Sequence, residues 1–248
     1  MHIGLLIIGD EILTGRRQDK HFAHVMQDLA TRGLELAWVR YVGDDDSILI
    51  QNLREISSIG DICFSFGGIG ATPDDKTRQA VAKAHEVPIV RHEEAVNEIE
   101  LQFGDAAYPN RILMADLPTG ANLIPNPINR IPGFSLGQIH CLPGFPEMAW
   151  PMLDWVLDNR YPMLKGRNAV LYSIIVPDAH ESELIQLMNE IQAAFPHIKL
   201  SSLPRFLPEN QHEIEMAVKG EEPAASAAFA RLKTMLSERG LEHRESGA

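Results

Sequence analysis

The chain has 248 residues, 45% of them hydrophobic and 23% charged, which predicts a globular protein with a packed core rather than a disordered tract. Its length exceeds the usual size of one domain, so a large domain followed by a smaller one is expected. The formal net charge of -12 and the lack of a basic run argue against a general nucleic-acid binder.

Hydropathy and cysteine usage indicate where the protein works. The longest apolar stretches, such as residues 3–8, are far shorter than the roughly 20 residues of a membrane helix. No signal peptide is present, so no membrane association is expected. Cys63 and Cys141 each lie inside an apolar run, which suits buried thiols in a reducing compartment. The sequence therefore predicts a cytoplasmic protein.

The first 165 residues alternate between strand and helix patterns. Residues 3–8 are continuously apolar and end at Gly9, which predicts a strand buried on both faces of a parallel sheet. Apolar residues at helical spacing follow from Phe22 to Leu29, and a strand pattern resumes over residues 34–42. This order is a βαβ unit.

The alternation then continues. Asp46 and Ser47 suit the cap of a helix, residues 62–66 form another buried strand, and residues 77–85 are helical. Strands that alternate with helices predict a doubly wound α/β domain, mostly parallel, with helices on both faces of the sheet.

Residues 121–144 are punctuated by proline and glycine, which predicts an added antiparallel hairpin whose second strand is residues 136–142. Pro146 then opens a helix that runs from Glu147 towards Asn159, with Pro151 as a local disturbance.

Residues 166–248 predict a small α+β domain in the order β-α-β-β-α. Its expected strands and helices are residues 169–176, 183–195, 198–203, 214–218 and 224–239.

The most informative segment is residues 67–75, GGIGATPDD, which lies between a buried strand and a helix. Gly67, Gly68 and Gly70 let backbone amides approach a ligand without a Cβ in the way, and amides at the start of a helix attract phosphate oxygens. A tight structural turn is the alternative, and the position after a strand favours a ligand loop.

A second loop, GDEILTG at residues 9–15, follows the first strand, and Asp44 follows the second. In open α/β sheets ligands lie beyond the carboxyl ends of the strands, at the point where the strand order reverses. We therefore expect residues 9–15 and 67–75 to share one site, with Asp44 at its rim.

Five carboxylates would lie near the expected phosphates. Their charges repel phosphate unless a divalent cation such as Mg²⁺ bridges them, or unless a carboxylate orients an attacking water. The simpler interpretation is helix capping, which we favour for Asp74, whereas we favour a functional role for Asp75. The five residues are Asp10, Glu11, Asp44, Asp74 and Asp75.

Other chemistries find little support. The ten histidines show no HExxH pattern and no pairing with cysteine at zinc spacing. Ser65 lacks a G-x-S-x-G elbow, and the chain has no Walker lysine motif.

Taken together, these stretches resemble the molybdopterin-binding domain of molybdenum-cofactor biosynthesis proteins, the MoaB/MogA-like family, and especially its competence-damage (CinA) branch. Five blocks in order carry the resemblance: GDEILTG at 9–15, VGDDDSIL at 42–49, GGIGATPDDKTRQAVAKA at 67–84, NPINRIPGF at 126–134 and LPGFPEM at 142–148. The small β-α-β-β-α unit resembles the accessory domain that follows in the CinA branch.

The resemblance implies a three-layer α/β sandwich, a pyrophosphate of a pterin or nucleotide between these loops, and a dimer or trimer. In cofactor-biosynthesis relatives the residue matching Asp75 assists adenylyl transfer, and an aspartate after the second strand matches Asp44. The resemblance and the loops together assign catalysis to Asp44 and Asp75 and a divalent metal to Asp10, Asp44 and Asp75. They assign ligand binding to Gly9, Asp10, Glu11, Gly67, Gly68, Gly70, Thr72, Asp74, Thr77, Arg130, Pro143 and Gly144.

CinA relatives are associated with metal-dependent cleavage of ADP-ribose-like pyrophosphates, so such a hydrolase is the leading hypothesis, with Arg130 at the leaving group. Molybdopterin binding or adenylylation is the alternative, and a non-catalytic ligand-binding module is the third. This chain departs from the branch at Asp10, Ala71 and residues 128–131, and these departures are the support for the third hypothesis. The deamidase domain that often follows is absent from the 248 residues, so deamidation is not expected.

Overall fold

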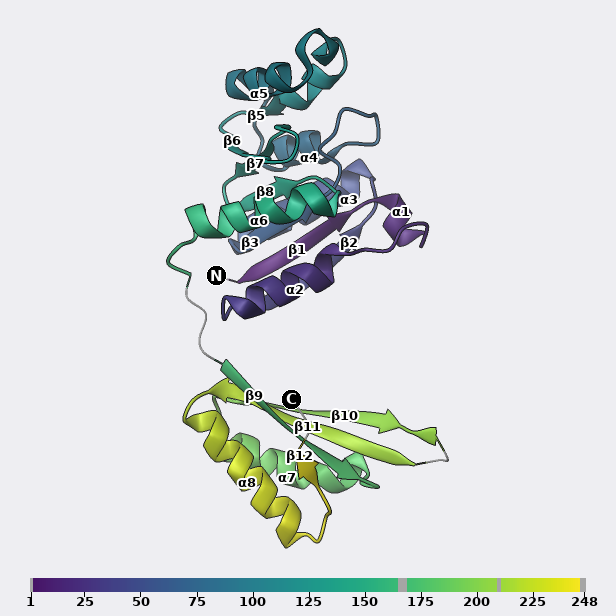
Figure 1. Ribbon diagram of the computed structural model, residues 1–248, viewed down its shortest axis with the longest axis vertical. Coiled ribbons are helices and arrows are strands. Elements are labelled where there is room, and N and C mark those ends of the chain that lie inside the picture. The colour runs from purple at the N-terminus through teal and green to yellow at the C-terminus, as the bar shows by residue number, and fades with distance from the viewer. Residues whose placement is uncertain (1, 165–168, 209–210, 246–248) are drawn as a thin grey trace. The chain divides into compact units, whose positions relative to one another are not determined.

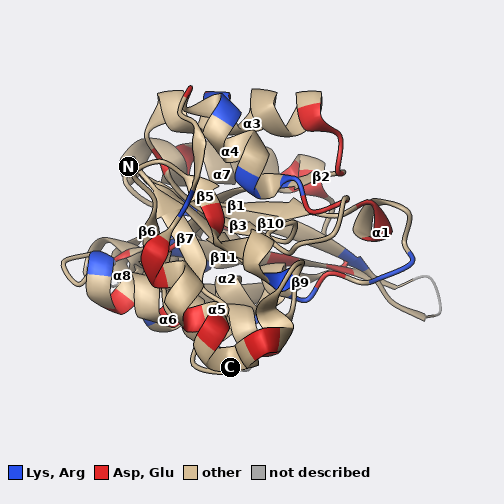
Figure 2. Cartoon of the chain, turned by 90° about the horizontal axis from the view of Figure 1, so that it is seen from above, with Lys and Arg blue, Asp and Glu red and all other residues tan. Residues whose placement is uncertain are grey.

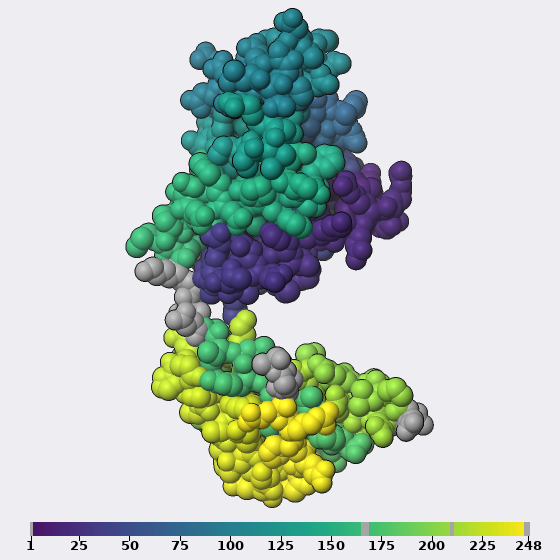
Figure 3. Space-filling model, viewed as in Figure 1, coloured from purple at the N-terminus to yellow at the C-terminus, as the bar shows by residue number. Residues whose placement is uncertain are grey.

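The computed structural model describes residues 2–164, 169–208 and 211–245. The chain divides into two compact units, Met1–Lys165 and Gly166–Ala248. Each unit is a closely packed body with its own secondary structure (Figures 1 and 3). None of the described helices is both long enough and apolar enough to cross a bilayer.

The N-terminal unit is built on a six-stranded sheet. Its strands are, in spatial order, β2 (Leu36–Val42), β1 (Ile3–Ile8), β3 (Ile62–Phe66), β8 (Ile139–Leu142), β7 (Gly133–Leu136) and β6 (Asn122–Ile124). The first four strands are parallel, while β7 and β6 are antiparallel to their neighbours. Every residue of β1 and β3 is buried, so the expectation of strands covered on both faces is confirmed.

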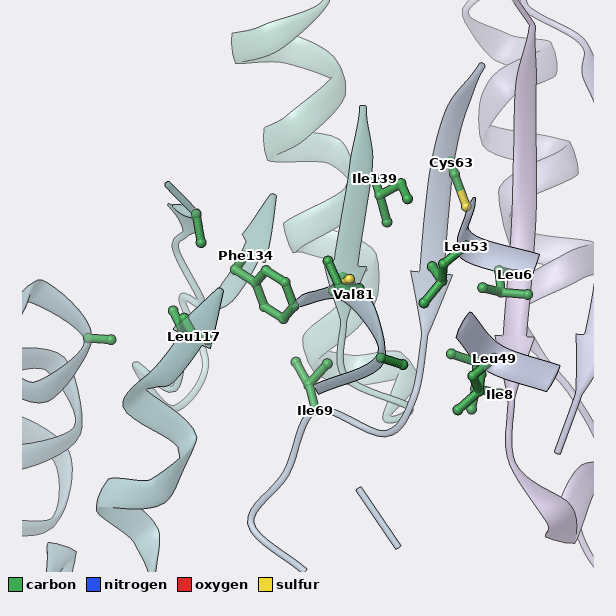
Figure 4. Packing of buried hydrophobic residues seen from close by; sticks show 14 of the residues in the cluster. Leu6, Ile8, Leu49, Leu53, Cys63, Ile69, Val81, Leu117, Phe134 and Ile139 are labelled. Carbon is green, nitrogen blue, oxygen red and sulfur yellow. The ribbon is translucent and has the colours of Figure 1, made fainter. Parts of the chain in front are cut away.

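Helices cover both faces of this sheet (Figure 1), which makes three layers. On one face, Leu5 and Phe64 pack with residues of α2 (His21–Thr31) and α6 (Pro146–Arg160). On the other face, Leu6 and Cys63 pack with residues of α3 (Asp46–Ile59) and α4 (Thr77–Ala84), as Figure 4 shows. Alternate residues of each strand thus feed two apolar cores, which confirms the expected mostly parallel α/β sandwich.

Elements that the sequence analysis did not assign fill residues 86–120. They are β4 (Ile89–Arg91), α5 (Glu93–Phe103), two short 3-10 helices η1 (Gly104–Ala107) and η2 (Arg111–Ala115), and β5 (Asp116–Pro118). β4 and β5 pair with each other as a separate two-stranded sheet.

Three local predictions were wrong. Residues 136–142 are not one strand, because Gly137 adopts a φ of 58° and forms the turn between β7 and β8. The α3 cap is Asp45, not Asp46, since its side chain accepts hydrogen bonds from the amides of Ser47 and Ile48. Asp74 does not cap α4, which follows Lys76 without any side-chain cap.

The C-terminal unit has a four-stranded antiparallel sheet in the order β10 (Lys199–Phe206), β11 (His212–Glu221), β9 (Ala169–Pro177) and β12 (Arg244–Glu245). Its two helices, α7 (Glu181–Ala194) and α8 (Ala224–Glu238), share one apolar core with the strands. The predicted β-α-β-β-α order is confirmed, and β12 adds a short last strand.

Candidate functional site

The carboxyl ends of β1 and β3 meet at one cavity. β1 lies between β2 and β3, so the chain leaves β1 on one side and returns on the other, which is the point where open α/β sheets bind ligands. The cavity there has a volume of about 820 Å³. It is within the usual range for small-molecule sites. It is lined by the segments 7–9, 11–12, 16–21, 66–72, 74–75 and 143–148, with Asp44, Met114, Asn126, Asn129 and Ile131.

The glycine loop after β3 is held in a conformation that requires glycine. Gly67 has a φ of 104°, and a Cβ on it would lie 2.5 Å from the carbonyl oxygen of Ile8. Thr77, the first residue of α4, stabilises the loop because its Oγ1 donates a hydrogen bond to the Gly67 carbonyl at 2.9 Å. Among the residues that the structure describes, no protein acceptor pairs the amides of residues 68–71. Four consecutive amides at the cavity are thus able to bind an oxyanion.

Asp75 shapes the same loop. Its Oδ2 accepts hydrogen bonds from the Thr72 amide at 3.0 Å and the Thr72 hydroxyl at 2.5 Å. A Cβ on Gly70 would lie 2.4 Å from that oxygen, so the carboxylate sits directly against the glycine. Thr72 also acts on the neighbouring Asp74, because a hydrogen bond from its side chain lowers the pKa of that carboxyl group. Asp75 is therefore engaged in the loop itself.

Asp44 lies at the rim, next to the short helix α1 (Asp10–Leu13). Its Oδ2 accepts a hydrogen bond from the Asp10 amide at 3.0 Å, and Asp10 Oδ1 accepts one from the Asp44 amide at 3.2 Å. Burial raises the pKa of Asp44, and the hydrogen bond from the Asp10 amide partly opposes this rise. The negative charges of Asp10, Glu11 and Asp74 raise the pKa further. Asp44 is thus a carboxylate with increased proton affinity.

A divalent metal was expected near Asp10, Asp44 and Asp75. Within residues 2–164, 169–208 and 211–245, no three His, Cys, Asp or Glu side chains are grouped so that they could hold a metal ion. The residues therefore do not fit a metal held by protein ligands alone. They do fit a cation such as Mg²⁺ that takes one or two carboxylates and completes its shell with phosphate oxygens and water. Glu11 and Asp74, which line the cavity and act electrostatically on Asp44, are suitable donors.

Sequence reasoning missed a basic segment in the cavity wall. Arg16, Arg17 and Lys20 follow α1 and line the cavity. Figure 2 shows the acidic α1 beside this basic stretch of chain. Two adjacent arginines after the GDEILTG block were a usable signal, although the acidic composition of the whole chain hid it. These cations offset the repulsion between the carboxylates and a phosphate.

His21, at the start of α2, was also missed. It is buried, lines the cavity and stacks on Phe66 with ring centroids 4.3 Å apart. Its Nε2 lies 3.3 Å from the Gly144 carbonyl oxygen, which can only accept, so Nε2 carries the proton. Burial lowers the pKa of His21, which keeps the ring neutral. Isolated histidines carry no sequence signal that would have identified it.

The structure places most of the predicted site residues in the cavity lining and leaves three outside it. Arg130 does not line the cavity, because the chain turns there with a φ of 61° and its Nε pairs with Glu98 at 2.9 Å. Asp10 and Thr77 act through Asp44 and the glycine loop rather than at the cavity surface. The predicted residues that do line it are Gly9, Glu11, Asp44, Gly67, Gly68, Gly70, Thr72, Asp74, Asp75, Pro143 and Gly144.

Comparison with known proteins identifies the unit that carries this cavity. The family model described as a probable molybdopterin binding domain matches residues 4–165, more than half of the chain. The chain belongs to this molybdopterin-binding family. The CinA-like protein of Anaeromyxobacter sp. (strain Fw109-5) is 34% identical over 190 residues, which cover 73% of this chain and 46% of that protein. A protein of Caldivirga maquilingensis is 29% identical over 245 residues, which cover 94% of this chain and 93% of the relative.

A solved structure agrees with the sequence relatives. The crystal structure of the protein CinA with unknown function from Thermoplasma acidophilum has 27% identity and a TM-score of 0.59, covering 64% of this chain and 98% of that one. The molybdopterin-binding domain is thus of the CinA N-terminal type, as expected. The chain spans less than half the length of the Anaeromyxobacter CinA-like relative.

Proposed function

We propose that the molybdopterin-binding domain binds a phosphate-bearing nucleotide or pterin and hydrolyses an ADP-ribose-like or FAD-like pyrophosphate with the help of a divalent cation. One observation carries the proposal: the unpaired amides of residues 68–71, the cations Arg16, Arg17 and Lys20, and the Asp44 carboxylate all belong to one cavity. Oxyanion donors and a carboxylate of increased proton affinity are the groups that cleavage of a pyrophosphate requires.

The glycine loop and the basic segment bind different parts of the ligand. The amides that follow Gly67 receive oxygens of one phosphate, and the basic segment receives the charge of the other phosphate. As the bridging P–O bond breaks, negative charge grows on the leaving phosphate, and Arg16 or Arg17 stabilises it in the role first given to Arg130. Both arginines lie in the loop after α1. The Arg17 amide donates a hydrogen bond to the Glu11 carbonyl at 2.9 Å, which ties this loop to the helix.

Asp44 is our candidate for the proton acceptor. The Asp10 amide occupies Asp44 Oδ2 at 3.0 Å, which leaves Oδ1 to receive a hydrogen bond from water. The water oxygen forms a bond to phosphorus while the bridging P–O bond breaks, and the water proton passes to Oδ1. ADP-ribose would give AMP and ribose 5-phosphate. When bound beside Glu11 and Asp74, a divalent cation supplies charge neutralisation and polarises the phosphoryl group.

Incubation of the full chain with ADP-ribose or FAD, with Mg²⁺, Mn²⁺, Co²⁺ or Ni²⁺ in turn, tests the hydrolase. AMP release is followed by anion-exchange chromatography. Asp44→Asn keeps an acceptor for the Asp10 amide but removes the base, so its turnover should fall at least about 100-fold. Asp105→Asn, an exposed change in η1, is the control. No AMP with any metal, or full turnover in Asp44→Asn, would overturn the proposal.

Light scattering on the same sample tests the expected dimer or trimer.

A second candidate is molybdopterin binding or adenylylation, which the family description itself favours. It uses the same oxyanion donors, and the transferred group is an adenylyl moiety from ATP. Native mass spectrometry of the protein mixed with molybdopterin and ATP separates the two functions. A mass increase by molybdopterin or its adenylylated form, without AMP release from ADP-ribose, supports the second candidate over the first.

A further inference from the structure

Phe145 is an exposed aromatic side chain on the wall of the cavity. It is 52% exposed, although large apolar side chains are generally buried when packing allows. It lies between Gly144, whose carbonyl oxygen contacts the ring of His21, and the first residue of α6, Pro146. The roles proposed above for the glycine loop and the carboxylates do not involve Phe145.

The backbone holds this aromatic ring in a defined place. The Phe145 carbonyl accepts hydrogen bonds from the amides of Met148 at 3.1 Å and Ala149 at 2.9 Å, so Phe145 is the cap of α6. Pro146 at the first helical position fixes the entry of the chain into the helix. An exposed ring on such a rigid support is suited to binding rather than to packing.

A cation from another segment of the cavity lining covers the ring. The guanidinium carbon of Arg17 lies 5.5 Å from the centre of the Phe145 ring, and both residues line the cavity. The contact joins the loop after α1 to the start of α6. A guanidinium pairs with aromatic faces and with phosphates through the same planar group. Arg17 can thus contact the ring or a bound phosphate.

We propose that Phe145 is the stacking platform for the planar heterocycle of the ligand, and that Arg17 moves from the ring face to the ligand's phosphate on binding. The inference rests on the proposed function and adds the residue that recognises the aromatic heterocycle of the ligand. Stacking of a base on an aromatic side chain outweighs an exposed cation–π contact, so the heterocycle displaces the guanidinium.

The proposal also explains why ring and phosphate groups share the cavity. The unpaired amides of residues 68–71 select phosphate but accept any phosphate ester. A separate aromatic platform gives the site a preference for adenine, flavin or pterin over a bare sugar phosphate. The cavity of about 820 Å³ is large enough for both parts of such a ligand.

The test compares two ligands that differ only in the heterocycle, AMP and ribose 5-phosphate, neither of which has a pyrophosphate bond to be hydrolysed. Their affinities for wild type, Phe145→Ala, Phe145→Leu and Phe145→Trp are measured by ligand-observed NMR with Mg²⁺ present. Phe145→Ala and Phe145→Leu should weaken AMP about tenfold and change ribose 5-phosphate less than twofold, while Phe145→Trp restores AMP binding. Phe206→Ala, at an 89% exposed ring of the C-terminal unit, is the control.

The affinities of FMN and of a phosphate-free pterin are measured in the same way. The ligand whose affinity falls most in Phe145→Ala identifies the preferred heterocycle. Equal weakening of AMP and ribose 5-phosphate would show that Phe145 only supports the fold of the cavity and would overturn the proposal. Unchanged binding of all heterocycles in Phe145→Ala would overturn it as well. These affinities do not depend on hydrolysis, so failure of the hydrolase and failure of the ring site are distinguishable. Wild type that binds neither phosphate ligand contradicts both.

Discussion

Asp10 and Asp44 hold each other's backbone across the ends of β1 and β2. The Asp10 amide donates to Asp44 Oδ2 at 3.0 Å, and the Asp44 amide donates to Asp10 Oδ1 at 3.2 Å. The pair is partly exposed, yet it joins two loops that are 34 residues apart. Asp10 thereby fixes the orientation of the Asp44 carboxylate at the cavity rim, although its own side chain does not line the cavity.

The reciprocal pair predicts different effects for two substitutions of Asp10. Asp10→Asn keeps an acceptor for the Asp44 amide and removes a charge that raises the pKa of Asp44, so binding of phosphate ligands should be retained or improved. Asp10→Ala removes the acceptor and should lower the free energy of unfolding by about 1 kcal/mol. Urea unfolding and ligand titration check both variants. Equal behaviour of the two would show that only the charge matters.

Buried periodic segments made the fold predictable, and short irregular ones did not. The largely apolar stretches of β1 and β3 identified the parallel sheet directly. Within residues 86–120, β4, β5 and the two 3-10 helices are only three to five residues each, too short to show a period. Their placement depends on tertiary contacts, such as the Arg78 guanidinium that binds the Asp116 carbonyl at 3.1 Å, and no local pattern encodes these. α5 is eleven residues long and buries Ala95 and Ile99, so its helical spacing was a usable signal that went unrecognised.

The candidate site was predictable where backbone geometry selects the residue. Gly67 must be glycine because of its φ and its contact with Ile8, so the glycine loop stands out in the sequence. Side chains that reach the cavity from flanking segments, such as Arg17 and His21, share no fixed spacing with it. Arg130 looked suitable by charge and by its place in the matching block at 126–134, but its pairing with Glu98 could only be seen in three dimensions.

Gly67 and Gly15 both have positive φ angles, which separates two costs of adding a side chain. At Gly15, with a φ of 70°, a Cβ meets nothing within 4 Å, so Gly15→Ala should cost only the conformational strain of about 1–2 kcal/mol. At Gly67 a Cβ would also lie 2.5 Å from the Ile8 carbonyl oxygen. Gly67→Ala should therefore destabilise the domain more than Gly15→Ala and abolish phosphate binding. Thermal unfolding measures the difference, and equal losses would contradict the close approach.

Arg78 connects the glycine loop to residues 113–116. It is buried, and its guanidinium donates to the carbonyl oxygens of Gly70 at 2.6 Å, Asp116 at 3.1 Å and Leu113. Arg78→Met fits the space but leaves these acceptors unpaired, at about 1–3 kcal/mol for each one that stays buried.

We expect Arg78→Met to lower the free energy of urea unfolding by at least about 1 kcal/mol, since at least one acceptor stays unpaired. Amide hydrogen exchange of Gly67, Thr72 and Thr77, whose amides donate hydrogen bonds within or next to the glycine loop, should also become faster. Arg54→Met, an exposed change on α3, is the matched control and should do neither. Normal exchange in a destabilised Arg78→Met protein would show that the glycine loop does not depend on this tether.

His140 makes the stability of the domain depend on pH. Its side chain is fully buried, with Nδ1 2.8 Å from Ser135 Oγ and Nε2 2.7 Å from the Tyr161 hydroxyl. Burial, with a smaller effect of Arg160, lowers the pKa of His140 from 6.5 to about 3. Between these values the unfolded chain binds a proton that the folded chain does not, so stability is lost as the pH falls below about 6.5.

His140→Gln keeps groups that can hydrogen-bond but has no proton to gain, so its stability should fall less steeply with decreasing pH. The difference in slope should approach about 1.4 kcal/mol per pH unit between pH 6 and 4, the limit for one proton. Burial lowers the pKa of His21 and His85 in the same direction, so part of the slope should remain. Urea unfolding at pH 7, 6, 5 and 4 measures both proteins. Parallel pH profiles would mean that His140 is protonated in the folded state or that its site opens to water before it titrates.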